Sequence, residues 1–190
     1  MHQAFHWINE PTTWADKDGV LSVVTDAQTD FWRETWYGFE RFSGHIYATE
    51  ISSDFTFQVR VRADFDTLYD QAGIMLMQDE RHWLKAGIEY NDGAPAIGSV
   101  LTLGKSDWAT GNYSGDPREF WLRLTRQGEA LRLQYSTDGH RWPLLRLCPF
   151  PTGMAKVGVM CCTPQRSGLK VDFHDLSLLS PNGKDLHDLS

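Results

Sequence analysis

Two opposite charges flank a glycine in HWLKAGIEY, residues 82–90, at a spacing that suits ligand binding. In an extended strand Lys85, Gly87 and Glu89 share one face, and the apolar residues between them share the other. Lys85 and Glu89 then stand about 13 Å apart, too far for a direct pair. Gly87 leaves a place where a ligand or another backbone can approach closely. The pattern predicts a ligand groove or, alternatively, the solvated outer face of a sheet.

The preceding segment QAGIMLMQ, residues 71–78, adds an amide to this face. The short connection DER predicts a hairpin between the two segments, which makes them neighbouring strands. Gln71 and Gly73 share a face, so Gln71 supplies a hydrogen-bond donor and an acceptor near Lys85 and Glu89.

A second unusual stretch is TDFWRETWYGF, residues 29–39, which predicts one extended strand with rings and charges on both faces. One face carries Phe31, Arg33, Thr35 and Tyr37, and the other carries Trp32, Glu34 and Trp36. A strand that covers a core normally has one apolar side and one polar side. One face of this strand is therefore a candidate for binding.

Catalytic and metal-binding motifs are weak or absent. Glycoside hydrolysis needs two carboxyl groups that flank the scissile bond, and Glu34 and Glu89 are the weak candidates, each from a separate strand. The seven histidines and three cysteines follow no metal-ligand spacing, so we predict no transition-metal site, assign no metal ligands and expect no cofactor. A structural calcium ion, held at the edge of the sandwich by carbonyl groups and aspartates, stays open as an alternative. The sequence favours a protein that is not an enzyme; if it is one, it is a glycoside hydrolase.

Strand patterns separated by turn signals fill the chain. The segment DFTFQVRVRADF, residues 54–65, alternates apolar and polar residues over its whole length. About a dozen such segments follow one another, and no segment has a helical pattern. We predict one all-β domain over residues 1–180, a sandwich or jelly roll, followed by a loosely attached polar tail at 181–190.

Composition restricts the partners and the compartment. The net charge of −7 is spread along the 190 residues without basic clusters, which argues against nucleic acid. The start of the chain does not resemble a secretory signal, and no apolar run is long enough to cross a membrane. Cys148, Cys161 and Cys162 make a poor disulfide framework, so we expect buried thiols and a cytoplasmic location.

The order of these blocks resembles the regulation-of-enolase-type family of concanavalin A-like proteins. It also resembles the C-terminal concanavalin A-like domain of some β-xylosidases and arabinofuranosidases. The matching positions are Phe31, Trp32, Arg33, Thr35, Tyr37, Gly38 and Phe39; Asp70, Gln71, Ala72 and Gly73; and Lys85, Gly87, Ile88 and Glu89. The resemblance implies a two-sheet jelly-roll sandwich with one concave face, without an established catalytic activity.

The resemblance also suggests which residues bind a ligand. It implies that the Arg33 face of residues 29–39 looks into a concave groove, whereas Trp32 turns inward and Glu34 and Trp36 reach the sheet margin. The family's Gly-His pair falls on Gly44 and His45. The expected ligand-binding residues are Arg33, Thr35, Tyr37, His45, Gln71, Lys85 and Glu89.

Two functions follow as hypotheses. A groove with rings, charges and an amide suits a polyhydroxylated ligand, which predicts a non-catalytic carbohydrate-binding or sugar-sensing protein. The alternative is a protein-interaction or regulatory domain of carbohydrate metabolism, in which the groove or a sheet edge contacts a protein partner or a second copy.

Overall fold

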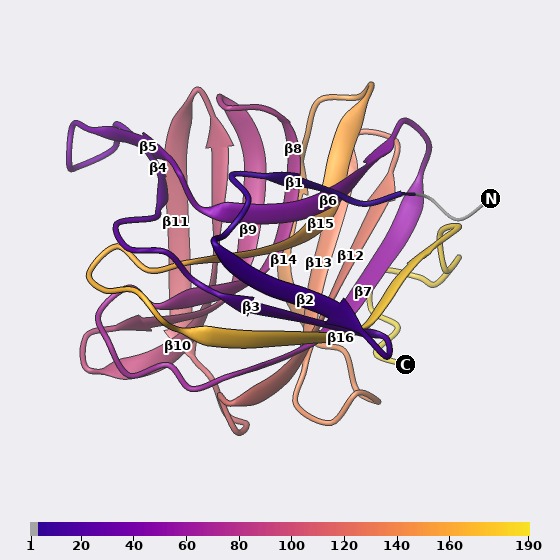
Figure 1. The fold of residues 1–190 in the computed structure, drawn as a ribbon. Helices are drawn as coiled ribbons and strands as arrows, with labels where there is room; N and C mark the ends of the chain where they lie inside the picture. Colours follow the sequence, from indigo (N-terminus) through magenta and orange to yellow (C-terminus); the bar gives the residue numbers. More distant parts are fainter. Residues whose placement is uncertain (1–3) are drawn as a thin grey trace.

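Two large antiparallel sheets and a small two-stranded one make up the computed structural model, which describes residues 4–190 (Figure 1). Sheet A has the strand order β1 (His6–Ile8), β6 (His45–Ile51), β15 (Ala155–Cys162), β8 (Gln71–Asp79), β9 (His82–Asn91), β10 (Ala94–Leu103) and β11 (Lys105–Asn112). Sheet B has the order β14 (Leu144–Pro149), β13 (Ala130–Ser136), β12 (Glu119–Gln127), β7 (Phe55–Ala63), β16 (Lys170–Leu179), β3 (Val20–Val24) and β2 (Thr13–Lys17). The small sheet pairs β4 (Phe31–Arg33) with β5 (Glu40–Phe42) and is called the β4–β5 arm.

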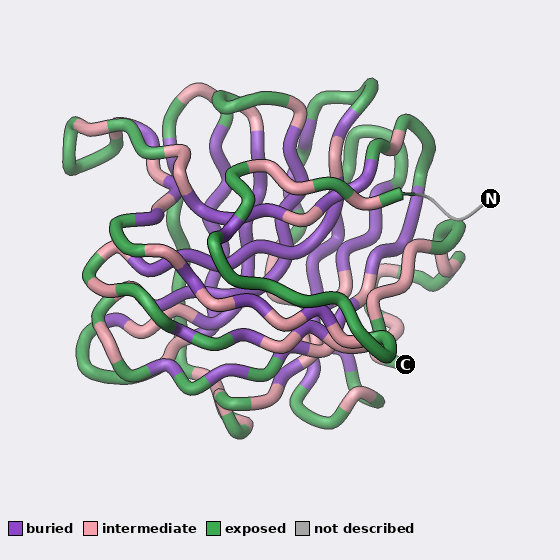
Figure 2. The backbone as a smooth tube through the Cα atoms, in the orientation of Figure 1, coloured by how far each residue is buried: buried purple, intermediate pink, exposed green. Residues whose placement is uncertain are grey.

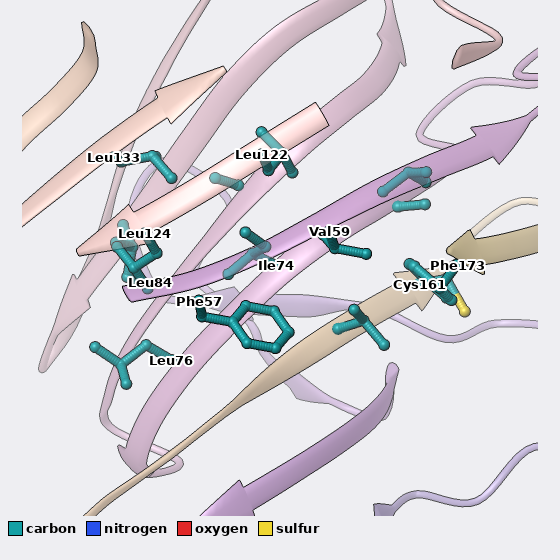
Figure 3. Close-up of a cluster of buried hydrophobic side chains, with 14 of the residues drawn as sticks. Phe57, Val59, Ile74, Leu76, Leu84, Leu122, Leu124, Leu133, Cys161 and Phe173 are labelled. Atoms are coloured by element: carbon teal, nitrogen blue, oxygen red, sulfur yellow. The ribbon is translucent and has the colours of Figure 1, made fainter. Parts of the chain in front are cut away.

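The main core fills the space between sheets A and B. Side chains from both sheets meet there, as the close-up in Figure 3 shows for Phe57 and Leu122 of sheet B and Ile74 and Leu84 of sheet A. The alternating apolar residues of β7 are buried in this core, which confirms the face predicted from the sequence. Burial of these side chains is the main force that holds the two sheets together.

The segments with clear alternation form strands close to their predicted limits, and the all-β prediction is confirmed. Four further strands, β1, β2, β5 and β11, were not predicted. Strand β2 is exposed along its whole length (Figure 2), and β11 is largely exposed. An edge strand that buries few side chains has no apolar alternation to reveal it. Within residues 4–190, no helix is long and apolar enough to cross a membrane.

The outer face of sheet A is partly apolar and is covered by the β4–β5 arm. A second cluster of buried residues lies there, consisting of Phe31, Ile46, Ala48, Met75, Met77, Trp83, Val100, Met160 and Cys162. Phe31 of the arm is fully buried, and its ring centroid lies 6.2 Å from that of Trp83 on β9. The arm is therefore anchored on sheet A and borders the part of this face that remains open.

The C-terminal segment is attached to sheet B, contrary to the expectation of a loose tail. The Arg132 guanidinium donates to the Asp188 carbonyl oxygen at 2.6 Å, and Arg123 donates to the Ser190 carbonyl oxygen at 3.0 Å. The backbone N–H of Trp142 donates to the Leu189 carbonyl oxygen at 2.8 Å. The tail is polar in composition, but sheet B supplies donors for its backbone carbonyl groups.

Candidate functional site

The floor of the candidate site is the outer face of β8 and β9. Gln71 on β8 is the cross-strand partner of Glu89 on β9, and Gly73 lies opposite Gly87 in the next row. The residues between them on each strand point into the main core. Gln71, Lys85 and Glu89 consequently share the outer face, as the sequence predicted.

The two glycines allow β8 and β9 to pair closely. A Cβ atom on Gly73 would lie 1.9 Å from the backbone oxygen of Ala86, and one on Gly87 would lie 1.9 Å from that of Ala72. No side chain can be accommodated at such a distance. Of the two roles predicted for Gly87, the structure therefore shows the close approach of another backbone.

Lys85 extends over this glycine row. Its Nζ donates a 2.5 Å hydrogen bond to Gln71 Oε1, although two register steps separate the two residues. The long, unbranched lysine stem spans this distance, and Gly73 and Gly87 present no side chains in its way. Lys85 and Gln71 are each only 4% exposed, so the ammonium group lies almost buried in the floor.

Glu89 lies in the same floor and is half-buried. Burial raises the pKa of this carboxyl above its ordinary value, the positive charge of Lys85 opposes the shift, and the negative charge of Asp30 adds to it. Within residues 4–190, no ion pair joins Lys85 to Glu89. Both groups are therefore available to a ligand.

Above the floor is a cleft of about 630 Å³ with an aromatic wall. Trp32, Tyr37 and Phe39 of the arm and its connecting loop line the cleft together with Trp108 of β11. The rings support one another, because the Trp32 ring centroid lies 5.5 Å from that of Tyr37 and 6.4 Å from that of Trp108, both in edge-to-face contact. Flat apolar surface thus adjoins buried polar groups.

A pair of tyrosines closes one side of the cleft. The hydroxyl oxygens of Tyr37 and Tyr69 lie 3.4 Å apart, and both residues line the cleft. The hydrogen bond with Tyr37, together with burial, raises the pKa of Tyr69 to about 12. Tyr69 also has a positive φ of 64°, which a bulky residue rarely adopts.

The loop between β4 and β5 has a constrained backbone. Glu34 and Trp36 have φ values of 60° and 64°, and each is spanned by a hydrogen bond between its two neighbours, from Thr35 N to Arg33 O and from Tyr37 N to Thr35 O. These are γ-turns of the rare positive-φ kind, which are strained. The indole N–H of Trp32 donates to the Thr35 carbonyl oxygen at 2.9 Å and helps to fix the loop.

This loop corrects the prediction of one strand over residues 29–39. Only Phe31–Arg33 is extended, and the γ-turns then rotate the following side chains out of a two-residue alternation. Trp32 lines the cleft instead of turning inward. Trp36 is 93% exposed at the tip of the arm, not at the sheet margin.

Arg33 lies under the arm and outside the cleft, so its predicted orientation is wrong. Its guanidinium donates to Glu40 at 2.7 Å and to the Gly104 carbonyl oxygen at 2.9 Å, and its backbone N–H donates to Ser106 Oγ. The residue is 9% exposed. Arg33 thus attaches the arm to the β10–β11 hairpin.

His45 and Thr35 also lie outside the cleft. His45 is buried, its Nδ1 donates to the Asn9 carbonyl oxygen at 2.6 Å, and its Nε2 accepts a bond from the Asp26 backbone N–H at 3.0 Å. Both ring nitrogens are therefore used in structural hydrogen bonds that join β6 to the segments around Asn9 and Asp26. Thr35 lines a separate surface hollow beside Trp36 and Trp108.

The two carboxyl groups considered for catalysis do not share a cavity. Glu34 forms an ion pair with Lys105 at 2.9 Å, and this contact lowers the pKa of the Glu34 carboxyl. Of these two groups, Glu89 lines the cleft and Glu34 does not; the Asp30 carboxyl also lines it. Within residues 4–190, no three His, Cys, Asp or Glu side chains gather in a group that could hold a metal ion.

Of the seven expected ligand-binding residues, the cleft brings together Tyr37, Gln71, Lys85 and Glu89. Sequence reasoning missed Trp108, Tyr69 and Asp30, which also line it. Trp108 lies in the polar strand β11, which lacks apolar alternation, and its aromatic side chain was the only signal. Tyr69 and Asp30 are in connections, where no periodic pattern indicates a direction.

Comparisons with known proteins agree with this fold. The chain is 55% identical over 185 residues to "Regulation of enolase protein 1" of Saccharomyces cerevisiae, covering 97% of this chain and 93% of the relative. A crystal structure of a functionally unknown protein from the same yeast matches with 53% identity and a TM-score of 0.92, over 94% of this chain and 97% of that one.

Two more distant structures share the fold alone. The carbohydrate-binding module CBM66 of Bacillus subtilis matches with a TM-score of 0.58 and 14% identity, over 94% of this chain and 98% of that one. A xylan β-1,4-xylosidase of Bacillus halodurans matches with a TM-score of 0.70 and 11% identity, over 90% of this chain and 35% of that one. These likenesses support the predicted concanavalin A-like jelly roll.

A family model described as "Protein of unknown function (DUF1349)" matches residues 7–181. This match and the identity to the yeast protein cover nearly the whole described chain and confirm the resemblance found in the sequence. The protein therefore belongs to the DUF1349 family.

Proposed function

We propose that the cleft on the outer face of sheet A binds a carbohydrate without cleaving it. The observation that carries this proposal is the combination of an aromatic wall, including Trp32 and Trp108, with a polar floor in which Gln71 and Lys85 are buried and Glu89 is half-buried. A sugar ring has an apolar face that packs on aromatic rings and hydroxyl groups that need donors and acceptors. The cleft offers both within about 630 Å³.

Each floor residue has a defined part in this proposal. Lys85 and the Gln71 amide donate hydrogen bonds to hydroxyl oxygens, and the Glu89 carboxylate accepts from hydroxyl groups. Hydrogen bonds to charged groups in a nearly dry site are stronger than neutral ones, about 1.5–3 kcal/mol each. Glu34 lies outside the cleft, so the pair of Glu34 and Glu89 considered for hydrolysis is not assembled there. Asp30 does line the cleft, but its Oδ1 accepts a hydrogen bond from the backbone N–H of Phe31 at 2.7 Å.

The names of the similar proteins support a regulatory use of such binding. One structural neighbour is a carbohydrate-binding module, and the yeast relative is a regulation-of-enolase protein. A protein that binds a sugar and thereby regulates carbohydrate metabolism would agree with both names. We place it in the cytoplasm, since its three cysteines are free and buried.

Isothermal titration calorimetry with a panel of mono- and oligosaccharides tests the proposal. We expect at least one sugar to bind the wild type and Trp108→Ala to weaken its binding about tenfold or more, because stacking surface is lost. Trp14→Ala is the matched control, since Trp14 is 38% exposed, Trp108 is 36% exposed, and Trp14 lies on sheet B. Equal affinity of the wild type and Trp108→Ala for every bound sugar would contradict the proposed site.

A second candidate function, interaction with a protein or a second copy, rests on the tip of the arm. Trp36 projects into solvent in a strained loop beside the cleft. We propose that this surface forms a homodimer contact in a regulatory assembly. Sedimentation velocity at rising concentration should show a dimer for the wild type and a monomer for Trp36→Ala; a wild type that stays monomeric excludes the homodimer.

A further inference from the structure

We infer that the ligand of the cleft is a polyhydroxylated molecule that carries an anionic group, a carboxylate or a phosphate, held by Lys85 and Gln71. This inference rests on the proposed function and names the ligand class. It follows from the hydrogen-bond donors that the floor leaves unused, from the burial of the positive charge, and from the position of Glu89.

The floor has an excess of donors. An ammonium group has three N–H donors, and one of those on Lys85 goes to Gln71 Oε1. The amide nitrogen of Gln71 has two more donors and makes no hydrogen bond within residues 4–190. Four N–H groups therefore remain for a ligand at one place, and the oxygens of a carboxylate or phosphate accept several such bonds at once.

Within the described chain, the positive charge of Lys85 has no direct ion-pair partner, although the carboxyl groups of Glu89 and Asp30 line the same cleft. Lys85 is only 4% exposed, and a buried charge normally requires an ionic partner. Arg33 illustrates the usual arrangement, because it is similarly buried and pairs with Glu40 at 2.7 Å. No carboxylate within residues 4–190 makes such a pair with Lys85. An anionic ligand group would complete the site.

Glu89 is not the ion-pair partner of Lys85. It is the cross-strand partner of Gln71, and the Gln71 amide oxygen, not the Glu89 carboxyl, accepts the bond from Lys85. Burial favours the protonated form of Glu89, which weakens its repulsion of a ligand anion. Glu89 is then suited to a hydroxyl group of the same ligand, and Trp108 and Trp32 to the flat face of its ring.

Calorimetry with D-glucose, D-glucuronate and D-glucose 6-phosphate at low salt tests the inference. We expect at least one anionic sugar to bind tenfold or more tightly than glucose, with affinity that falls as salt rises. Comparison of the two anionic sugars distinguishes a carboxylate ligand from a phosphate ligand. Lys85→Met, which keeps the length of the side chain, should reduce their affinity to that of glucose, and Gln71→Glu, which supplies an internal anion, should do the same.

Two controls separate binding from folding. Lys17→Met removes an exposed lysine of β2 and should leave all affinities unchanged. The melting temperature of Lys85→Met should equal or exceed that of the wild type, because the cost of burying the charge without an ion-pair partner outweighs the single hydrogen bond to Gln71 that the variant loses. A lower melting temperature together with unchanged affinity for anionic sugars would assign Lys85 a structural role and overturn the inference.

Other outcomes test the inference and the proposed function separately. Glucose binding as tightly as both anionic sugars overturns the anionic ligand and leaves carbohydrate binding intact. Inorganic phosphate that binds as tightly as glucose 6-phosphate, in a Lys85-dependent way, supports the anion site and contradicts the need for a sugar. Failure of both anionic sugars to bind at millimolar concentration also overturns the inference, and the oligosaccharide panel then decides the proposed function.

Discussion

At the scale of single residues, the main feature of the cleft is that Lys85 and Glu89, which have opposite charges, are withdrawn from water without forming an ion pair. Lys85 is almost completely buried and donates a hydrogen bond to Gln71, and Glu89 lies nearby without forming an ion pair with Lys85. Buried ionisable groups that do not satisfy one another reduce stability, and they are concentrated at functional sites. This arrangement is easier to explain by a ligand than by the needs of the fold.

The raised pKa of Glu89 gives a pH-dependent prediction. The folded protein binds the proton of the Glu89 carboxyl more tightly than the unfolded chain does, and this difference stabilises the folded state. The stabilisation is complete below the pKa in the unfolded chain, near 4.5, and is lost as the pH rises through the pKa in the folded protein. Glu89→Gln removes this titration. We expect the free energy of unfolding of the wild type, relative to that of Glu89→Gln, to fall as the pH rises from 4.5.

Urea unfolding at several pH values measures this difference. Carboxyl groups common to both proteins titrate equally and cancel in the comparison. Glu129→Gln, at an exposed position in a turn between β12 and β13, is the matched control. The prediction is contradicted if the difference in the free energy of unfolding between the wild type and Glu89→Gln stays constant with pH. It is also contradicted if the wild type gains stability relative to Glu89→Gln as the pH rises, because the pKa of Glu89 would then not be raised by burial.

At the scale of elements, the pairing of β8 with β9 and the attachment of the β4–β5 arm decide the shape of the site. The glycine row brings the two strands together and leaves Lys85 its path to Gln71. The arm and its loop supply Trp32, Tyr37 and Phe39 of the aromatic wall, β11 supplies Trp108, and Arg33 attaches the arm to the backbone of Gly104. The site thus requires a flat floor and a wall from a distant segment.

We predict that Gly73→Ala lowers the free energy of unfolding by about 3 kcal/mol, because the new methyl group would overlap the backbone of Ala86. Gly111→Ala on β11 is the matched control: its Cβ atom would meet nothing within 4 Å. For that variant we expect unchanged stability or a gain of up to about 1 kcal/mol. Similar losses in both variants, measured by denaturant unfolding, would contradict the close approach of β8 and β9.

At the scale of the whole molecule, the two sheets have different outer faces. Sheet A carries the arm (Figure 1) and the cleft. Sheet B holds the C-terminal segment through Arg123 and Arg132, and Trp142 in the connection between β13 and β14 adds a third bond. The segment is not loose, because backbone carbonyl groups that would otherwise face water are bonded to sheet B. Its contacts connect β12 and β13 to the end of the chain.

Removal of residues 181–190 should therefore lower the free energy of unfolding by about 2 kcal/mol, the sum of a few net hydrogen bonds and partly buried side chains. Arg132→Met, which retains an apolar stem but loses the bonds to Lys184 and Asp188, should produce part of this loss. Denaturant unfolding measures both changes. A truncated protein with wild-type stability would show that the segment contributes nothing to the folded state.

The all-β class and the faces of the well-patterned strands could be predicted from the order of the residues alone. Alternation along a strand is local, so the placement of Gln71, Lys85 and Glu89 on one outer face could be predicted from residues 71–78 and 82–90. The same reasoning identified the core face of β7. These features depend on neighbours along the chain and across one hairpin.

The surroundings of this floor, in contrast, depend on contacts between segments that are far apart in the sequence. The backbone of residues 34–39 adopts strained γ-turns that no local preference favours, and Arg33 finds its partners about 70 residues away, at Gly104 and Ser106. Trp32 and Trp108 meet across a similar separation. Contacts between distant segments produce no regular alternation of apolar and polar residues in the sequence. The aromatic wall could therefore not be predicted from the residues that form it.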